Sequence, residues 1–264
     1  YVWDNQGNKY LEGLAGLWCT ALGYGNQEVI DTASEQMGKL TFSHMFGGKT
    51  HQVAIDLADK LAEMIPMKDP VLSFGNSGSD ANDTHIKLLR YYHEAIGKPE
   101  CRKIISRERS YHGVTVAAAS LTGLPVTQNH FDLPVDALGI LHTDHPHYYR
   151  GKQGGESETE FVDRIVGNLE SMIVREGPDT IAAFIAEPIT GASGVIVPPA
   201  GYYQKVQAVL NRYNIMFWAD EVITGFGRTG SDFGCNTMGI ESPDMMTFAK
   251  QLSSAYMPIS ASAV

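Results

Sequence analysis

DEVITGFGRTG, residues 220–230, is the stretch that decides the fold prediction. Residues 215–219 before it are apolar and predict a buried strand, and Asp220 stands where that strand gives way to a glycine-rich turn. Ligands of parallel sheets bind at the carboxyl ends of the strands. The stretch therefore predicts an α/β protein with a functional carboxylate, Asp220, at one edge of its sheet.

A single lysine, Lys250, follows this block in small and uncharged surroundings. No other charged residue lies between Met245 and Val264, which favours a neutral, nucleophilic amine. A carboxylate, a glycine-rich turn and such a lysine are what a pyridoxal phosphate (PLP) enzyme needs. The lysine can hold the cofactor as a Schiff base, and the aspartate can hold its protonated pyridine nitrogen. From spacing alone, a surface lysine after a strand explains Lys250 equally well.

Composition and charge exclude several classes of protein. The 264 residues are 43% hydrophobic, which is enough for a large core in one big domain or two. The formal charge is −10, which argues against nucleic-acid partners and anionic membrane surfaces. No apolar run reaches membrane-spanning length and no signal peptide is visible, so no membrane association is expected.

The cysteines and histidines predict neither disulfides nor a metal site. The three cysteines are isolated, without a CxxC pair, which predicts a reducing, cytoplasmic location: Cys19, Cys101 and Cys235. Three closely spaced histidines lie in a polar, proline-containing stretch without a framework of carboxylates: His142, His145 and His147. A surface loop is the expectation there, and no metal is expected.

Apolar runs alternate with helical patterns along the chain. Strands are expected over 71–74, 103–106, 138–141, 180–186, 215–219 and 259–264. Helices are expected over 51–65, 79–96, 158–175 and 201–213. Alternation of this kind predicts an α/β fold with a mostly parallel sheet.

Polar motifs follow several of these strands. Ser77, Gly78 and Ser79 open a helix after the first strand, and hydroxyls, close backbone approach and helix dipole suit a phosphate there. An ordinary helix cap is the alternative. Tyr111 follows the next strand, either stacked on a planar cofactor or as a loop tyrosine, and Glu187 follows the strand at 180–186. With Asp220, four such motifs on strand ends are jointly much less probable by chance than any one alone.

Together these residues resemble the class III aminotransferases, often called ω-transaminases, which have PLP fold type I. The matching elements spread over nearly all 264 residues in the family's order: Leu14-Ala15-Gly16-Leu17-Trp18, Asn76-Ser77-Gly78-Ser79, Tyr111-His112-Gly113, Ala186-Glu187-Pro188, residues 220–230 and Ala249-Lys250. The block at 220–230 with its downstream lysine is highly specific, whereas Gly78-Ser79 alone is weak.

The resemblance implies a role for each matching residue. Lys250 resembles the Schiff-base lysine, which also moves the proton between substrate and cofactor, and Asp220 resembles the partner of the pyridine nitrogen. Val222 and Tyr111 resemble the residues that pack on the two ring faces. The remaining implied cofactor-binding residues are Ser77, Gly78 and Ser79 at the phosphate, Glu187 near the ring's 3-hydroxyl group, and His112 as a positioning residue.

The substrate pocket and two departures from the family pattern give further expectations. Trp18 resembles a substrate-pocket aromatic, and Phe46 is a second candidate; both also suit a core, which is the preferred expectation for Phe46. Asp80 stands where the family usually has glutamate, and Ala255 stands where it usually has glycine. The shorter Asp80 side chain is expected to loosen a contact near the phosphate-binding helix.

The resemblance also implies an activity and an organisation. The implied activity is a PLP-dependent ping-pong transfer of an amino group from an amine or ω-amino acid to a keto acid such as pyruvate. A homodimer with shared active sites is implied. Residues 1–35 are expected to belong to a small domain and residues 36–264 to the large PLP-binding domain.

Two other interpretations stay open. One is a PLP decarboxylase or aminomutase of the same fold. The other is a truncated, non-catalytic chain that only binds PLP or dimerises. The chain starts at Tyr1 without methionine and stops at Val264 inside an expected strand, so a fragment is expected that lacks a short N-terminal piece and a larger C-terminal domain.

Overall fold

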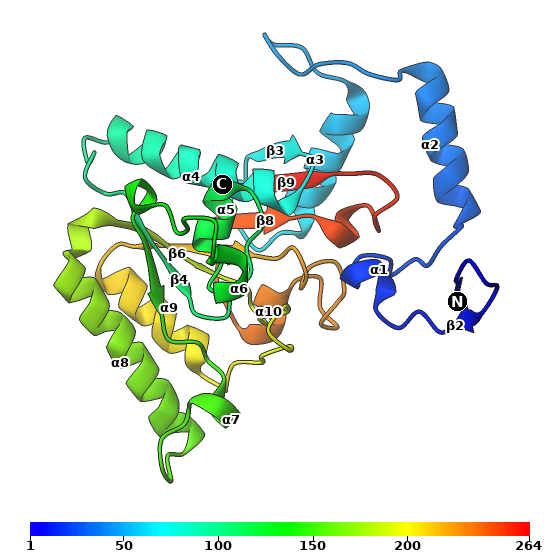
Figure 1. The fold of residues 1–264 in the computed structure, drawn as a ribbon. Coiled ribbons are helices and arrows are strands. Elements are labelled where there is room, and N and C mark those ends of the chain that lie inside the picture. Colours follow the sequence, from blue (N-terminus) through cyan, green and yellow to red (C-terminus); the bar gives the residue numbers. More distant parts are fainter.

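A seven-stranded sheet forms the centre of the computed structural model, which describes residues 1–264 (Figure 1). Its strands lie in the order β3-β9-β8-β7-β6-β4-β5. β9 alone runs antiparallel to its neighbours, β3 and β8, so all the other strands point the same way. The predicted mostly parallel α/β sheet is confirmed, and the carboxyl ends of these strands meet at one edge.

The bounds of the elements are close to those predicted for most of the chain. The strands of the sheet are β3 (Leu72–Gly75), β4 (Lys103–Arg107), β5 (Ile140–Thr143), β6 (Ile181–Ala186), β7 (Met216–Asp220), β8 (Met245–Phe248) and β9 (Ser260–Ala263). The longer helices are α2 (Gln27–Lys39), α3 (Gln52–Met64), α4 (Gly78–Ala95), α8 (Glu158–Glu176) and α9 (Tyr202–Arg212). Short elements complete the chain: β1 (Val2–Trp3), β2 (Lys9–Tyr10), α1 (Ala15–Trp18), α5 (Val116–Leu121), α6 (Pro125–Gln128), α7 (Tyr148–Gly151) and α10 (Gly234–Met238).

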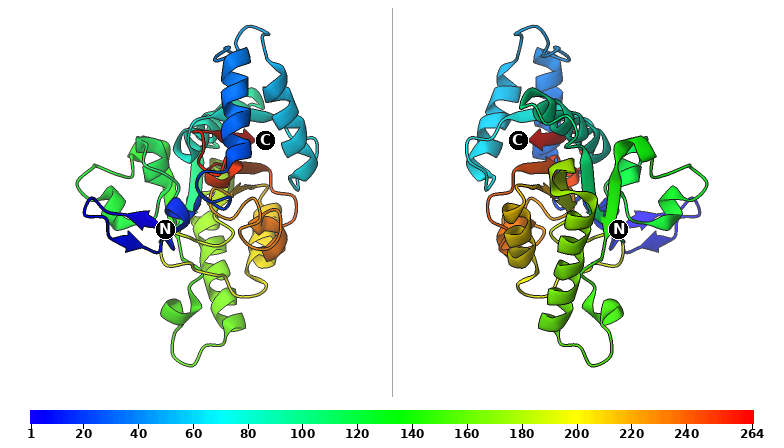
Figure 2. Two further views of the ribbon diagram at one scale, coloured as in Figure 1. Left: turned by 90° about the vertical axis from the view of Figure 1, so that its right-hand side faces the viewer. Right: turned by 90° about the vertical axis from the view of Figure 1, so that its left-hand side faces the viewer.

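Helices cover both faces of the sheet, which makes a three-layer core (Figures 1 and 2). β6 shows the reason, because successive side chains of a strand point to opposite faces and every residue of β6 is buried. Phe184 packs into the core formed with α8 and α9. Ile185 packs into the core formed with α4 and α5. No helix has the length and the apolar composition needed to cross a membrane.

The N-terminal segment, residues 1–50, contains no buried residue. Its helix α2 stands away from the sheet at the upper right of Figure 1. The expected core position of Phe46 is wrong, because its side chain is 82% exposed in the connection between α2 and α3. The predicted domain boundary between residues 35 and 36 falls inside α2.

Apart from the short helices, two elements were not predicted from the sequence, α2 and β8. α2 mixes polar residues with few large apolar ones and buries none of them, so its periodic pattern is weak. β8 is a short apolar run of four residues directly after Pro243-Asp244, too short to stand out from the sequence around Lys250. Asp220 pairs with Thr247 of β8 and therefore ends β7 itself rather than following it.

Acid should destabilise this fold through His85, which is fully buried in α4 with its ring edge-on to Trp218. Burial lowers the pKa of His85 to about 3. The unfolded chain binds a proton near pH 6.5 and the folded chain does not, so the free energy of unfolding falls as the pH falls from about 6.5 towards 3. The contribution of His85 is at most about 1.4 kcal/mol per pH unit.

Replacement His85→Asn keeps a side-chain N–H and removes the titration. Urea unfolding between pH 7 and pH 5 should therefore show a shallower loss of stability than in the unsubstituted chain. His44→Asn is the matched control, since His44 is exposed. If the free energy of unfolding changed with pH in the same way for all three proteins, the role assigned to His85 would be contradicted.

Candidate active site

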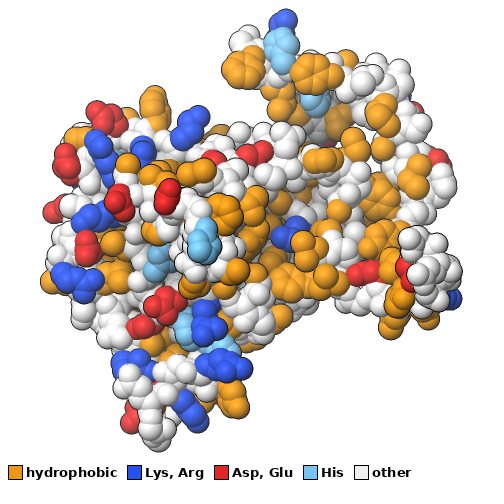
Figure 3. Space-filling model, viewed as in Figure 1, with side chains coloured by type: hydrophobic (Ala, Val, Ile, Leu, Met, Phe, Trp, Pro, Cys, Tyr) orange, Lys and Arg blue, Asp and Glu red, His pale blue; other side chains and the backbone are white.

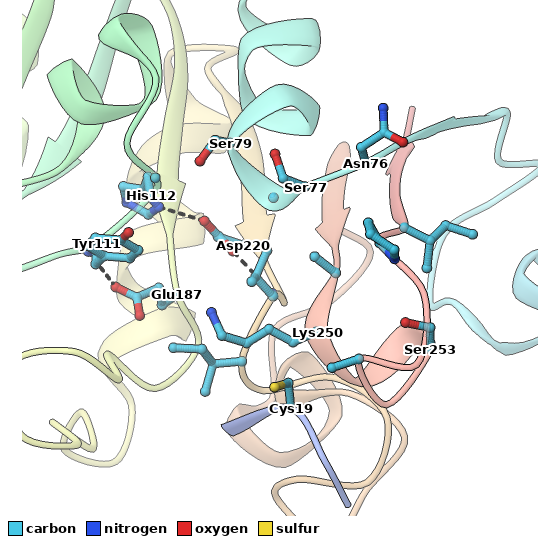
Figure 4. Close-up of a pocket in the computed structure, with 18 of the residues that line it drawn as sticks. Cys19, Asn76, Ser77, Ser79, Tyr111, His112, Glu187, Asp220, Lys250 and Ser253 are labelled. Carbon is cyan, nitrogen blue, oxygen red and sulfur yellow. Dashed lines mark hydrogen bonds and ion pairs between the residues drawn. The ribbon is translucent and has the colours of Figure 1, made fainter. Parts of the chain in front are cut away.

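A cavity of about 380 Å³ opens at the carboxyl edge of the sheet, a size typical of small-molecule sites (Figure 4). The loops after β3, β4, β6, β7 and β8 contribute its walls. Every residue predicted to bind a cofactor lines it: Ser77, Gly78, Ser79, Tyr111, His112, Glu187, Asp220, Val222 and Lys250. The structure thus brings together residues that lie up to 173 positions apart, from Ser77 to Lys250.

Asp220 is the best-satisfied polar group of the cavity and is only 3% exposed. Its Oδ2 lies 2.8 Å from Nδ1 of His112, and its Oδ1 accepts a hydrogen bond from the Val222 amide at 3.1 Å. A buried carboxylate needs such partners, because an unpaired buried charge is very costly. Asp220 is therefore held as an oriented acceptor at the cavity wall (Figure 4).

Lys250 follows β8 and extends into the same cavity (Figure 4). Its amine takes part in none of the ion pairs of the chain. Its backbone is strained, with φ at +46°, a conformation that L residues rarely adopt and that concentrates at functional sites. A half-buried amine without a salt-bridge partner is available for covalent chemistry.

The N-terminus of α4 provides a seat for an anion. Ser77, Gly78 and Ser79 line the cavity where this helix begins. A Cβ added to Gly78 would lie 2.9 Å from the Val222 side chain, so only glycine allows this approach. Free amides and the positive end of a helix of 18 residues favour a phosphate at such a point.

Asp80 does not loosen this helix, so the expectation drawn from its shorter side chain is wrong. Its carboxylate accepts hydrogen bonds from the amides of Asn76 at 2.8 Å and Ser77 at 3.1 Å. The Ser260 hydroxyl donates to it as well, at 3.0 Å. The short aspartate reaches these donors because the chain turns tightly there, and Ser77 completes a capping box.

Glu187 ties two loops of the cavity together. Its carboxylate accepts hydrogen bonds from the amides of Tyr111 and Gly191, both at 2.9 Å. Burial raises the pKa of Glu187, and the neighbouring His112 opposes that shift. Burial and the charge of Asp220 raise the pKa of Tyr111 as well, so its hydroxyl keeps its proton.

Trp18 lies in a left-handed turn beside the cavity. Residues 15–18 have φ values between +51° and +69°, which costs a non-glycine residue about 1–2 kcal/mol each. Glu12 offsets part of this cost, because its carboxylate accepts hydrogen bonds from the amides of Leu14 at 2.9 Å and Gly16 at 3.2 Å. The side chain adjacent to Trp18 that reaches the cavity is Cys19.

Trp18 and Ile223 come together at Gly191. A Cβ added to Gly191 would lie 2.7 Å from the Trp18 ring and 2.6 Å from Ile223, so all three meet at one point. Ile223 lines the cavity, whereas Trp18 does not. Phe46, the second aromatic candidate, does not line it either.

Sequence reasoning assigned no role to several cavity residues. Cys19, Asn76, Ile223 and Ser253 line the cavity together with the 255–259 segment. The signal for Ile223 was present, since it directly follows Val222 in the block at 220–230, from which Asp220 and Val222 also line the cavity. The 255–259 segment was given no role in the site, because it reaches the cavity only through the turn that leads from Lys250 into β9.

The histidines at 142, 145 and 147 form no metal site. No group of three or more His, Cys, Asp or Glu side chains is arranged to hold a metal ion. His145 instead accepts a hydrogen bond from the His147 amide at 3.2 Å. Burial and nearby arginines lower the pKa of His145 to about 4, which keeps it neutral.

Comparison with known proteins identifies a family. The model of the family described as aminotransferase class-III matches residues 1–264. A probable γ-aminobutyrate transaminase 2 of Oryza sativa subsp. indica is 51% identical over 100% of this chain and 53% of its own length. The γ-aminobutyrate transaminase 1 of Solanum lycopersicum is 52% identical over 99% of this chain and 50% of its own length. The chain therefore spans about half the length of the curated relatives it matches.

A solved structure gives the same assignment for the fold. The ω-transaminase of Pseudomonas jessenii in complex with PMP matches with a TM-score of 0.97 and 53% identity. The match covers 100% of this chain and 58% of that one. The expected PLP fold type I architecture is confirmed, and the relatives contain further residues outside the matched part.

The expected cytoplasmic location is contradicted by these relatives. The rice and tomato transaminases are named as mitochondrial, and a further tomato relative, 51% identical, is named as chloroplastic. The error lies in the reasoning from cysteines. Three unpaired cysteines indicate only a compartment in which disulfides do not form, and they do not say which one.

Replacement Gly191→Ala should strain the contact between Trp18 and Ile223. The backbone of Gly191 does not require glycine, so the cost is steric, and overpacking of this kind costs about 1–3 kcal/mol. Gly167→Ala is the matched control, because a Cβ at this exposed position of α8 meets open space and stabilises a helix by about 0.5–1 kcal/mol. Urea unfolding measures both changes; equal stabilities for the two variants would refute this packing.

Proposed function

The chain belongs to the class III aminotransferases, and from this we propose that it moves an amino group from an amine or ω-amino acid to a keto acid such as pyruvate. One observation carries the proposal. The amine of Lys250 and the buried carboxylate of Asp220 line the same cavity, beside a helix N-terminus suited to phosphate. The family uses PLP, and these three features are the ones that PLP requires.

The residues of the cavity fit PLP by their chemistry. Ser77, Gly78 and Ser79 would hold the phosphate, since the glycine leaves the α4 N-terminus open. Asp220 would hold the pyridine nitrogen and keep it protonated. Val222 and Tyr111 would pack against the ring. When bound, PLP withdraws electrons from the carbon that bears the amino group, which acidifies its C–H bond.

We assign the proton transfer to Lys250. Its Nζ would hold the cofactor covalently until an incoming amine displaces it, and the freed Nζ would then take the proton from the substrate carbon. Lys250 has no ion-pair partner in the protein, so the amine is free to move between these positions. His112 holds Asp220 in place during the exchange through the 2.8 Å contact.

For the donor, we favour an ω-amino acid such as γ-aminobutyrate. The support is the 51–52% identity to plant γ-aminobutyrate transaminases. The similarly close ω-transaminases, one engineered for bulky amines, support a broader amine donor. Ile223, which meets Trp18 at Gly191, would form the wall against which the donor lies.

We also propose a homodimer with shared active sites, in which residues 1–35 belong to a small domain. The support is the exposed apolar surface of the N-terminal segment, where Trp3, Leu17, Phe42 and Phe46 are each at least 62% exposed. Figure 3 shows hydrophobic side chains gathered over this segment and the adjoining middle of the view, whereas most charged side chains lie towards its left. An apolar surface of this kind marks an interaction site. Sedimentation velocity should give twice the monomer mass, and a monomer at micromolar concentration would contradict the proposal.

Replacement Lys250→Ala tests the function. Turnover of γ-aminobutyrate with a keto acid should fall by at least about a hundredfold, because the general base is lost. PLP binding should weaken but persist, because the phosphate seat and Asp220 remain. Lys87→Ala, at an exposed position of α4, is the control and should keep full activity. Near-normal turnover in the Lys250→Ala variant would contradict the role of Lys250 as general base.

A further inference from the structure

A chain of buried polar side chains lies behind Asp220. It comprises Asn82, His85, Trp218 and Thr247, each 0% exposed. None of them lines the cavity. Buried polar groups far from water are costly unless their hydrogen bonds are made, so the pattern of these bonds matters.

The direction of the hydrogen bonds begins at Trp218. An indole Nε1–H can only donate, and it donates to Oγ1 of Thr247 at 2.8 Å. The Thr247 hydroxyl must place its own hydrogen elsewhere. It lies 2.8 Å from Oδ1 of Asn82, which is a suitable acceptor.

His85 is the other neighbour of the Thr247 hydroxyl. Its Nδ1 lies 3.1 Å from Oγ1 of Thr247, and the backbone of Ala263 also lies close to its ring. Burial keeps the ring neutral, so it carries one N–H only. The contact of Thr247 with Asn82 is shorter, 2.8 Å against 3.1 Å, so Asn82 is the better acceptor for the Thr247 hydrogen.

Asn82 passes this direction on to Asp220. Because its Oδ1 accepts from Thr247, its Nδ2 must face the other way. The Nδ2 group donates to the carbonyl of His112 at 2.6 Å and to Oδ2 of Asp220 at 3.2 Å. If the amide were turned over, its oxygen would face a carbonyl and a carboxylate, and all three would repel.

We infer that Asn82 is a positioning residue for Asp220, and that Trp218 and Thr247 fix the orientation of its amide. A carboxylate has about four acceptor positions. On Asp220, three are filled by His112, Asn82 and Val222. We call the hydrogen-bonded series Trp218, Thr247 and Asn82 the relay. It holds the Asp220 carboxylate in place and leaves one of its acceptor positions facing the cavity. This inference rests on the proposed function only in that the free position receives the PLP ring nitrogen.

The test compares two substitutions of Thr247. Thr247→Val keeps the volume but removes the hydroxyl, so the Asn82 amide is no longer oriented. Thr247→Ser keeps the hydroxyl. The readouts are the dissociation constant of PLP, the pH midpoint of the bound PLP absorbance change, and the NMR signal of the His112 Nδ1–H in PLP-free protein.

Thr247→Val should weaken PLP binding about tenfold, move the pH midpoint and shift the His112 signal; a hydrogen bond to a charged group has about that value. Thr247→Ser should stay within about twofold of the unsubstituted protein in binding and leave the other two readouts unchanged. A merely structural role would change thermal stability in both variants and leave the pH midpoint alone. Identical readouts for Val and Ser would overturn the inference.

Two further measurements separate failure of the inference from failure of folding or of PLP binding. If Thr247→Val does not fold, Asn82→Asp serves, because it keeps the shape but replaces the donor with a second carboxylate. It should weaken PLP binding more than tenfold, and unchanged binding would overturn the inference. If the unsubstituted protein fails to bind PLP, the proposed function fails, and the NMR signal of His112 alone decides the relay.

Discussion

The contact between His112 and Asp220 is the constraint on which the site depends. The two atoms are 2.8 Å apart, and both side chains are almost fully buried. Burying a carboxylate is costly unless its oxygens are paired, so the surrounding chain must supply donors. Those donors come from three separate segments: the loop after β4, the first turns of α4 and the second residue after β7. The site therefore assembles only when the sheet has its native order.

The order of the strands explains why these segments meet. β7 is central, with β6 on one side and β8 on the other, so the polar residues at their carboxyl ends converge: Glu187, Asp220 and Lys250. Strand β3, which leads into the anion seat, is separated from β8 only by the antiparallel β9. The two glycines Gly78 and Gly113 then let the chain close around the cavity, since a Cβ at either would meet Val222 or Ser79 at less than 3 Å.

The sequence predicted the sheet and the cavity wall well because both follow from short-range signals. Apolar runs ending in Glu187 or Asp220 identify strands and the edge at which their ends lie. Contacts between segments that are distant in the sequence could not be predicted from such short-range signals. Phe46 is apolar and suits a core by composition, yet no element packs over it. The role of Asp80 depended on a turn that brings Asn76 and Ser77 to its carboxylate. Asn82 carried no signal, because its partner Thr247 lies 165 residues away.

The central claim is that the amine of Lys250 holds PLP, and one measurement tests it most directly. The protein is incubated with PLP, reduced with borohydride and digested, and the modified peptide is identified by mass spectrometry. The account predicts a single pyridoxyl group on Lys250, in the peptide that follows β8. A pyridoxyl group on another lysine, or none at all with PLP bound, would contradict it.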